Sequence, residues 1–102
     1  MVFEDILLAG DFNADCSYLS KTANAALRLR QDARFKWLIS DDVDTTVGTT
    51  SCAYDRFIVT GNLLKRELRN AHVVDVAKLQ GITDPAVEKA VSDHQPIALQ
   101  LM

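Results

Sequence analysis

Residues 5–16 read DILLAGDFNADC and combine an apolar run with a polar cluster. A continuous apolar run closed by glycine is typical of a short buried strand, here over residues 5–10. Asp11 and Asn13 follow at its carboxyl end. In extended backbone residues i and i+2 point the same way, so these two side chains would offer adjacent oxygens to a hard cation such as Mg²⁺. The alternative is an Asx-turn, in which both side chains bond nearby backbone groups.

The composition indicates one small folded domain, residues 1–102, with no internal boundary. Apolar residues make up 48% of the 102 residues and charged residues 25%, which excludes disordered and fibrous classes. No apolar run approaches the roughly 18 residues that cross a bilayer, so we expect no membrane partner. Residues 3–5 are Phe-Glu-Asp, where a signal peptide would carry basic residues. The net charge of −3 gives no global attraction to a polyanion, and the basic residues within 28–36 are interpreted as a solvated face.

The order of periodic segments predicts an α+β fold: one mostly antiparallel sheet with helices on one face. A sheet covered on one face leaves its other face apolar, so the chain is predicted to be half of a larger unit or one partner of a dimer. Residues 63–68 are ambiguous. The other predicted elements are strands at 5–10, within 34–39 and at 52–60, 72–76 and 97–102, a helix from Lys21 capped by Ser20, a loop at 41–51, and a helix at 85–91 capped by Asp84.

Acidic and histidine side chains supply further candidates for chemistry. Asp93 and His94 precede the last strand and would bind a metal or move protons, unless they only form a turn with a surface histidine. Asp55 is an acid inside a strand, so it needs a partner, either Arg56 or a histidine elsewhere. His72 lies in an apolar strand and is interpreted as structural.

Two other groups have open interpretations. The loop around Asp44, Thr46 and Thr50 offers oxygens for Ca²⁺, or it is a threonine-rich solvent loop. Cys16 and Cys52 lack the paired CxxC spacing of a zinc site, which leaves either one disulfide or two buried thiols. A disulfide would contribute on the order of 3–4 kcal/mol in the chain-entropy model.

The chain resembles the C-terminal portion of the deoxyribonuclease I family, within the endonuclease/exonuclease/phosphatase superfamily. GDFN and SDH mark the superfamily, whereas CAYDR and the DTT loop mark the deoxyribonuclease I branch. The resemblance covers nearly the whole chain and implies half of a four-layer α/β/β/α sandwich. It is carried, in order, by GDFNADCSYL (10–19), LRLR (27–30), FKWLI (35–39), DTT (44–46), TSCAYDR (50–56) and SDHQP (92–96).

The resemblance also implies roles for individual residues. His94 corresponds to one of two catalytic histidines, and Asp55 to the acid that orients it. Gln95 stands where the family usually has an aromatic residue that packs beneath the site. The remaining implied roles are a Mg²⁺ and phosphate site (Asp11, Asn13, Asp93), a residue near the bound phosphate (Tyr54), a structural Ca²⁺ site (Asp44, Thr46, Thr50) and a disulfide (Cys16, Cys52).

The implied function is a secreted, divalent-cation-dependent endonuclease that hydrolyses DNA phosphodiesters. In this family the first half of the domain supplies a metal-binding glutamate, the second catalytic histidine and most of the actin contacts known for one member. We therefore expect the chain alone to be inactive or nearly so, and to need either the missing N-terminal half or a second copy as partner. Actin binding is not expected. The alternative is a non-catalytic half-fold that self-associates through its exposed sheet face.

Overall fold

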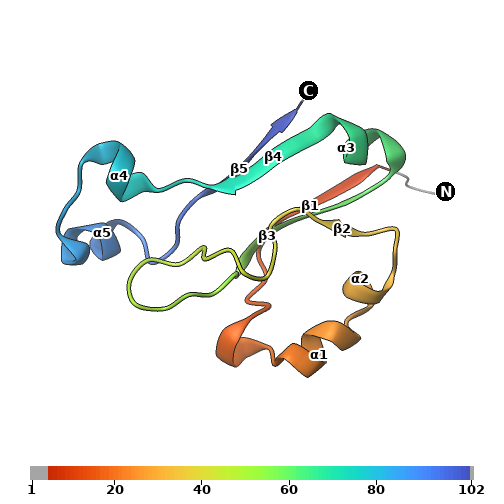
Figure 1. Ribbon diagram of the computed structural model, residues 1–102, viewed down its shortest axis with the longest axis horizontal. Helices are drawn as coiled ribbons and strands as arrows, with labels where there is room; N and C mark the ends of the chain where they lie inside the picture. Colours follow the sequence, from red (N-terminus) through yellow and green to blue (C-terminus); the bar gives the residue numbers. More distant parts are fainter. Residues whose placement is uncertain (1–4, 102) are drawn as a thin grey trace.

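The computed structural model describes residues 5–101, apart from the side chain of Leu101, and has a mixed α+β fold (Figure 1). The predicted fold class is therefore confirmed. The strands are β1 (Ile6–Asp11), β2 (Lys36–Trp37), β3 (Asp55–Thr60), β4 (Leu68–Val73) and β5 (Ile97–Leu101). The helices are a 3-10 turn η1 (Cys16–Tyr18), α1 (Lys21–Ala26), α2 (Arg28–Gln31), α3 (Asn62–Glu67), α4 (Val76–Gln80) and α5 (Pro85–Val91).

The described strands form two antiparallel sheets rather than the single sheet predicted. One sheet has the order β1-β3-β2, and β4 pairs with β5 in the other. The physical reason is that β1 and β2 occupy both edges of β3, so β4 has no free edge of β3 to join. It pairs with the last strand instead. The antiparallel pairing was predicted correctly, and the sandwich layering with helices on one face stays a prediction.

Local sequence signals account for most of the helix boundaries. Ser20 Oγ accepts a hydrogen bond from Ala23 N at 3.1 Å at the start of α1. Asp84 Oδ1 accepts from Ala86 N at 2.9 Å, ahead of Pro85 at the first turn of α5. These two caps were predicted from the sequence. The ambiguous segment at 63–68 resolves into α3 and the first residue of β4.

The strand predicted at 72–76 is wrong in its bounds. The strand is Leu68–Val73, and Asp75 instead caps α4 by accepting from Lys78 N at 3.0 Å. This cap outweighs the strand preference of the neighbouring valines, so the helix α4 went unpredicted. The strand predicted at 52–60 begins only at Asp55, and that at 34–39 is confined to residues 36–37. For the strand predicted at 97–102, Met102 lies outside the described residues.

The core lies along β3 and the segments around it. Ile58, Val59 and Ala53 are fully buried, and Ile39 and Leu68 are nearly so. The strand predicted at 5–10 is present as β1, Ile6–Asp11, but the prediction that it is buried is wrong. As an edge strand β1 is largely exposed, with Leu7 41% accessible. The accessible surface is 6959 Å², whereas a folded chain of 11.3 kDa is expected to expose about 5,700 Å². The chain therefore exposes more surface than a compact chain of its mass, and exposed apolar side chains such as Leu7, Leu79 and Val91 contribute to it.

A disulfide joins Cys16 to Cys52 with a Cα–Cα distance of 5.9 Å. This is the pairing that the family resemblance implies. It ties the loop after β1 to the residues just before β3, beside the hydrogen bond from Ala53 N to Asp15 Oδ2 at 2.9 Å. The two strands that carry Asp11 and Asp55 are thus held together at their polar ends.

Among the residues that the structure describes, no helix has the length and apolar character needed to cross a membrane.

Candidate functional site

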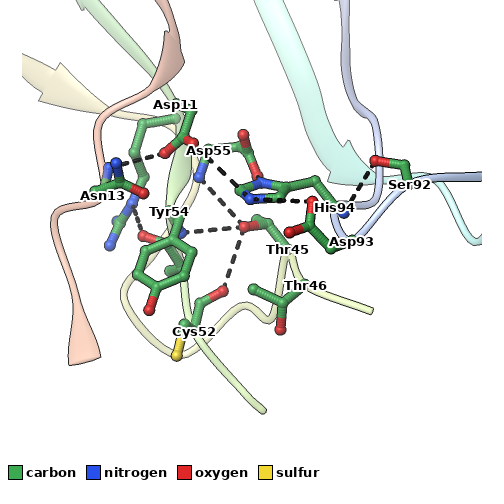
Figure 2. Close-up of polar contacts among 12 residues, drawn as sticks. Asp11, Asn13, Thr45, Thr46, Cys52, Tyr54, Asp55, Ser92, Asp93 and His94 are labelled. Carbon is green, nitrogen blue, oxygen red and sulfur yellow. Dashed lines mark hydrogen bonds and ion pairs between the residues drawn. The ribbon is translucent and has the colours of Figure 1, made fainter. Parts of the chain in front are cut away.

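Strand register brings two acids together at one end of the first sheet. Asp11 is the last residue of β1 and Asp55 the first of β3, and the two are directly paired. His94, from the segment between α5 and β5, lies beside them (Figure 2). One potential ligand atom from each of Asp11, Asp55 and His94 lies within 4.8 Å of the others. Three residues far apart in sequence therefore form one polar cluster.

Backbone pairing with the 45–47 loop holds His94 in this cluster. Val47 N donates to Asp93 O at 2.8 Å, and Gln95 N donates to Thr45 O at 2.8 Å. Thr46 and His94 form the resulting antiparallel bridge. In addition, His94 N donates to Ser92 Oγ at 3.1 Å. The imidazole is thus positioned by main-chain contacts on both sides of His94.

Asp55 fixes the orientation of the His94 ring. His94 Nδ1 lies 2.7 Å from Asp55 Oδ2, and Nε2 lies 3.8 Å from Asp11 Oδ2 and 3.9 Å from Asp93 Oδ1. The hydrogen bond to Asp55 raises the pKa of His94 above its usual value; burial opposes this, and the negative charges of Asp55, Asp11 and Asp93 reinforce it. The ring therefore presents Nε2 to the space shared by Asp11 and Asp93.

Of the two partners considered for Asp55, His94 is the one present. Arg56 is fully buried, and its guanidinium donates to Ala53 O at 2.8 Å and Ile39 O at 2.7 Å. Successive residues of a strand point to opposite faces, which separates Arg56 from its neighbour's side chain.

Replacing Asp55 with asparagine should lower the pKa of His94, because the main group that favours the imidazolium is lost. Because folding raises the pKa of His94, the Asp55–His94 pair stabilises the folded state more at low pH than at high pH. The Asp55–His94 pair contributes fully below the unfolded pKa of about 6.5 and is lost as pH rises through the higher folded value. NMR titration of the His94 ring in EDTA measures the shift. Asp93→Asn is the matched control and should lower the pKa less; an equal or larger drop would contradict the assignment to Asp55.

Asn13 does not have the extended backbone that would align its side chain with that of Asp11. It has a left-handed backbone with φ of 48°, and Asn13 N donates to Asp11 Oδ1 at 2.9 Å. The Asx-turn alternative is therefore present, because β1 ends at Asp11 and the chain turns at once. Figure 2 shows Asn13 beside Asp11 on the side away from His94. Asp11 thus still reaches the cluster, whereas Asn13 contacts it through Asp11.

Thr45 is a structural residue of the site that sequence reasoning missed. Its side chain is fully buried, and Thr45 Oγ1 accepts from Tyr54 N at 3.0 Å and Asp55 N at 3.2 Å. The same hydroxyl donates to Cys52 O at 3.2 Å. Thr45 therefore anchors the start of β3, where Asp55 begins. The only sequence signal was its place inside the DTT motif.

Replacing Thr45 with valine should lower the free energy of unfolding by about 1–3 kcal/mol, because two part-buried amides lose their acceptor. Thr45→Ser keeps the hydroxyl and is the matched control, with a smaller loss. Urea unfolding of the three proteins measures the difference. A valine variant as stable as the serine variant would show that the hydroxyl has no such role.

The residues of the predicted Ca²⁺ site converge within one loop. Asp44 Oδ1 accepts from Thr46 N at 2.9 Å, Thr46 Oγ1 at 2.6 Å and Cys52 N at 3.1 Å. Thr46 Oγ1 lies 3.0 Å from both Thr50 O and Thr50 Oγ1. Burial raises the pKa of Asp44, but the hydrogen bonds from Thr46 and Cys52 together outweigh it and lower that pKa. The loop offers carboxylate, hydroxyl and carbonyl oxygens at one place.

Tyr54 lies immediately before β3 and borders the cluster. Its ring centroid lies 6.0 Å from that of His94 and 5.5 Å from that of Tyr18. Burial first, and then the charges of Tyr18, Asp15 and Asp11, raise the pKa of Tyr54. The phenol therefore stays protonated and can donate a hydrogen bond.

The oxygen donors beside His94 and those in the loop of Asp44, Thr46 and Thr50 are of the kinds that the predicted cations bind. Mg²⁺ takes one or two carboxylates and keeps several waters, and the exposed carboxylates of Asp11 and Asp93 meet that need beside His94 Nε2. Ca²⁺ takes six to eight oxygens in flexible geometry, and the loop of Asp44, Thr46 and Thr50 offers oxygens of three kinds.

Comparison with known proteins gives one consistent result. No family profile matches the chain. The chain is 46% identical to deoxyribonuclease-1 of Equus caballus over 101 residues, which is 97% of this chain and 36% of that protein. It is 47% identical to deoxyribonuclease-1-like 2 of Homo sapiens over 100 residues, 96% of this chain and 33% of that protein. With deoxyribonuclease-1 of Ovis aries the identity is 42% over 99 residues, 95% of this chain and 38% of that protein.

These matches confirm the resemblance to the deoxyribonuclease I family. The chain spans about a third of the length of the curated relatives it matches. The similarity therefore applies to a segment of those proteins, and the chemistry of the whole enzyme does not follow from it directly.

Proposed function

We propose that this chain is the part of a deoxyribonuclease I-like phosphodiesterase that carries one catalytic histidine and its metal-binding acids. The observation that carries the proposal is the Asp11–Asp55–His94 cluster, found in a chain 46% identical to part of a deoxyribonuclease-1. The substrate proposed is DNA, and the reaction is hydrolysis of a phosphodiester bond by water.

In this mechanism His94 Nε2 holds or moves the proton of a reacting oxygen. Asp55 keeps the ring in the tautomer that frees Nε2 and stabilises the imidazolium, as its 2.7 Å contact to Nδ1 allows. Asp11 and Asp93 would hold Mg²⁺, with Asn13 and Tyr54 contacting the phosphate. When bound, the cation supplies neutralisation of the non-bridging phosphate oxygens.

The second cation site is proposed to be structural. Asp44, Thr46 and Thr50 would hold Ca²⁺ in the loop whose neighbouring residues position His94. Secretion is proposed as well, because disulfides persist in oxidising compartments and the chain contains one.

The proposed unit, residues 1–102, corresponds to the C-terminal half of a deoxyribonuclease I-like domain and completes its site with further polypeptide. Two observations support this: the chain covers 36% of the horse relative, and its accessible surface exceeds that of a compact chain of its size. The partner that would supply the missing catalytic groups is the remainder of the domain. Actin binding is not expected of this segment.

Plasmid relaxation in Mg²⁺ and Ca²⁺ tests the proposal. We expect the purified chain alone to leave supercoiled plasmid intact, and to cleave it when mixed with a polypeptide covering the unmatched two thirds of the horse deoxyribonuclease-1. Cleavage should cease in EDTA. Efficient cleavage by the isolated chain would contradict the incomplete-site proposal, and an inactive mixture with demonstrated complex formation would contradict the nuclease proposal.

The exposure of β1 favours one alternative, a non-catalytic half-fold that self-associates through its exposed sheet face. β1 lies at an edge of its sheet and carries Leu7, which is 41% accessible. An exposed apolar sheet face of this kind can pack against a second copy. Light scattering at micromolar concentration distinguishes the two: a dimeric mass supports self-association, and a monomeric mass contradicts it.

A further inference from the structure

A basic cleft lies away from the candidate site. It has a volume of about 510 Å³ and brings together Lys36 of β2, Lys65 and Arg66 of α3, and Arg69 of β4. Among the described residues that line it, none is acidic. A chain with a net charge of −3 thus concentrates four cations at one concave place.

The fold, rather than the sequence order, creates this concentration. Lys36 pairs with Val59 near the end of β3, and α3 follows directly and contacts both β3 and β4. Residues 29 positions apart are thereby placed around one cleft. Figure 1 shows β2 and α3 toward the same end of the sheet, opposite to α4 and α5.

Nearby acids neutralise only part of this charge. Glu67 Oε1 lies 3.3 Å from Arg66 Nε, and Asp32 is held by Arg34, with Oδ2 2.6 Å from Nη2. Arg69 Nε donates to a neutral acceptor, Arg66 O, at 3.2 Å. The cleft therefore keeps a net positive charge, and Lys36, Arg66 and Arg69 are exposed to solvent.

The cleft is separate from the catalytic cluster. Lys36 is paired with Val59, four residues along β3 from Asp55, so about 13 Å of strand separates the two places. A ligand in the cleft therefore does not contact His94 or Asp11 directly.

We propose that this cleft binds the phosphate backbone of DNA as an anchoring site distinct from the site of cleavage. The inference rests on the proposed function, because it takes DNA as the ligand. Clustered Lys and Arg side chains bind such a backbone without reading its sequence and release counterions in doing so. A second contact of this kind raises the effective concentration of DNA at the cluster.

Salt-dependent binding of a fluorescent duplex to the full chain in EDTA tests the inference. The test variant, Lys36→Gln/Lys65→Gln/Arg66→Gln, removes three cleft charges and leaves Arg69 with its backbone acceptor. The slope of log K against log salt should fall in magnitude by about 2.7, since each phosphate contact contributes about 0.9. Between 50 and 200 mM salt the wild type should therefore lose about 40-fold more affinity than the variant.

The matched control, Lys21→Gln/Lys78→Gln/Lys89→Gln, makes the same change in net charge at exposed positions on α1, α4 and α5. It should keep the wild-type slope. Equal slopes in the two triple variants, at equal thermal stability, would overturn the cleft as the binding place. Stronger competition by a sulfated polysaccharide than by DNA, at equal charge concentration, would overturn the assignment of the ligand.

This test is independent of catalysis, because EDTA removes the divalent cation that the proposed reaction requires. An unchanged slope in the cleft variant would refute the anchoring site and leave the nuclease proposal standing. Retained cleft binding with no cleavage in the completed domain would refute only the nuclease proposal.

Discussion

Replacing His94 with alanine in the completed domain should lower the rate of DNA cleavage about 10²–10⁴-fold, the contribution typical of one general acid or base. The expected loss is large because His94 is the imidazole that the described part of this chain contributes to the cluster; His72 lies on β4. Single-turnover cleavage of a plasmid measures the rate.

His72→Ala is the matched control, since it removes the same side chain from a place where Nδ1 contacts Asn70 O. Its cleavage rate should stay within a few-fold of the wild type. Imidazole added to the His94→Ala protein should restore part of the lost rate if the ring acts on protons. A rate unaffected by the His94 substitution would refute its proposed role.

Replacing both cysteines with serine should lower the free energy of unfolding by about 4 kcal/mol. The disulfide spans 36 positions, and the chain-entropy model gives about this value for a loop of that length. Because the bridge adjoins the ends of β1 and β3, its loss also releases the alignment of Asp11 with Asp55. Urea unfolding of the oxidised wild type and of the double variant measures the change.

Two observations complete the disulfide test. Reduction of the wild type should increase its intact mass by two hydrogens, and the reduced protein should unfold at the same urea concentration as the variant. Complete unfolding of the variant in buffer agrees with the expectation, because a small domain has little stability to lose. A loss below about 1 kcal/mol would show that the bridge is not a main source of stability.

Sequence reasoning succeeded where the determinants are local. The caps at Ser20 and Asp84 and the presence of β1 were predicted correctly, because each depends on residues within one turn or one strand, whereas the burial expected for β1 was wrong. It failed on the pairing of β4, since that depends on both edges of β3 being occupied. The helix α4 was missed for a different reason: its cap at Asp75 is local, but it competes with the strand preference of the neighbouring valines.

Some residues of the candidate site were predicted from the sequence, and the roles of others are visible only in the folded chain. Family resemblance pointed to Asp11, Asp55, Asp93 and His94, and the fold brings these four near one another. The shared orientation predicted for Asp11 and Asn13 requires extended backbone, and an i+2 spacing does not reveal that Asn13 is left-handed. Thr45 was missed because its role comes from three backbone groups that only the folded chain assembles.

The backbone pairing of residues 45–47 with 93–95 has a consequence for how the molecule comes apart. Asp11 and Asp55 sit on paired strands beside a covalent bridge, whereas His94 arrives on a later segment attached through Thr45 and Val47. A local opening of that segment would withdraw the imidazole and leave the two acids in place. Warming should therefore displace His94 from the cluster at a lower temperature than the one at which β1, β2 and β3 unfold.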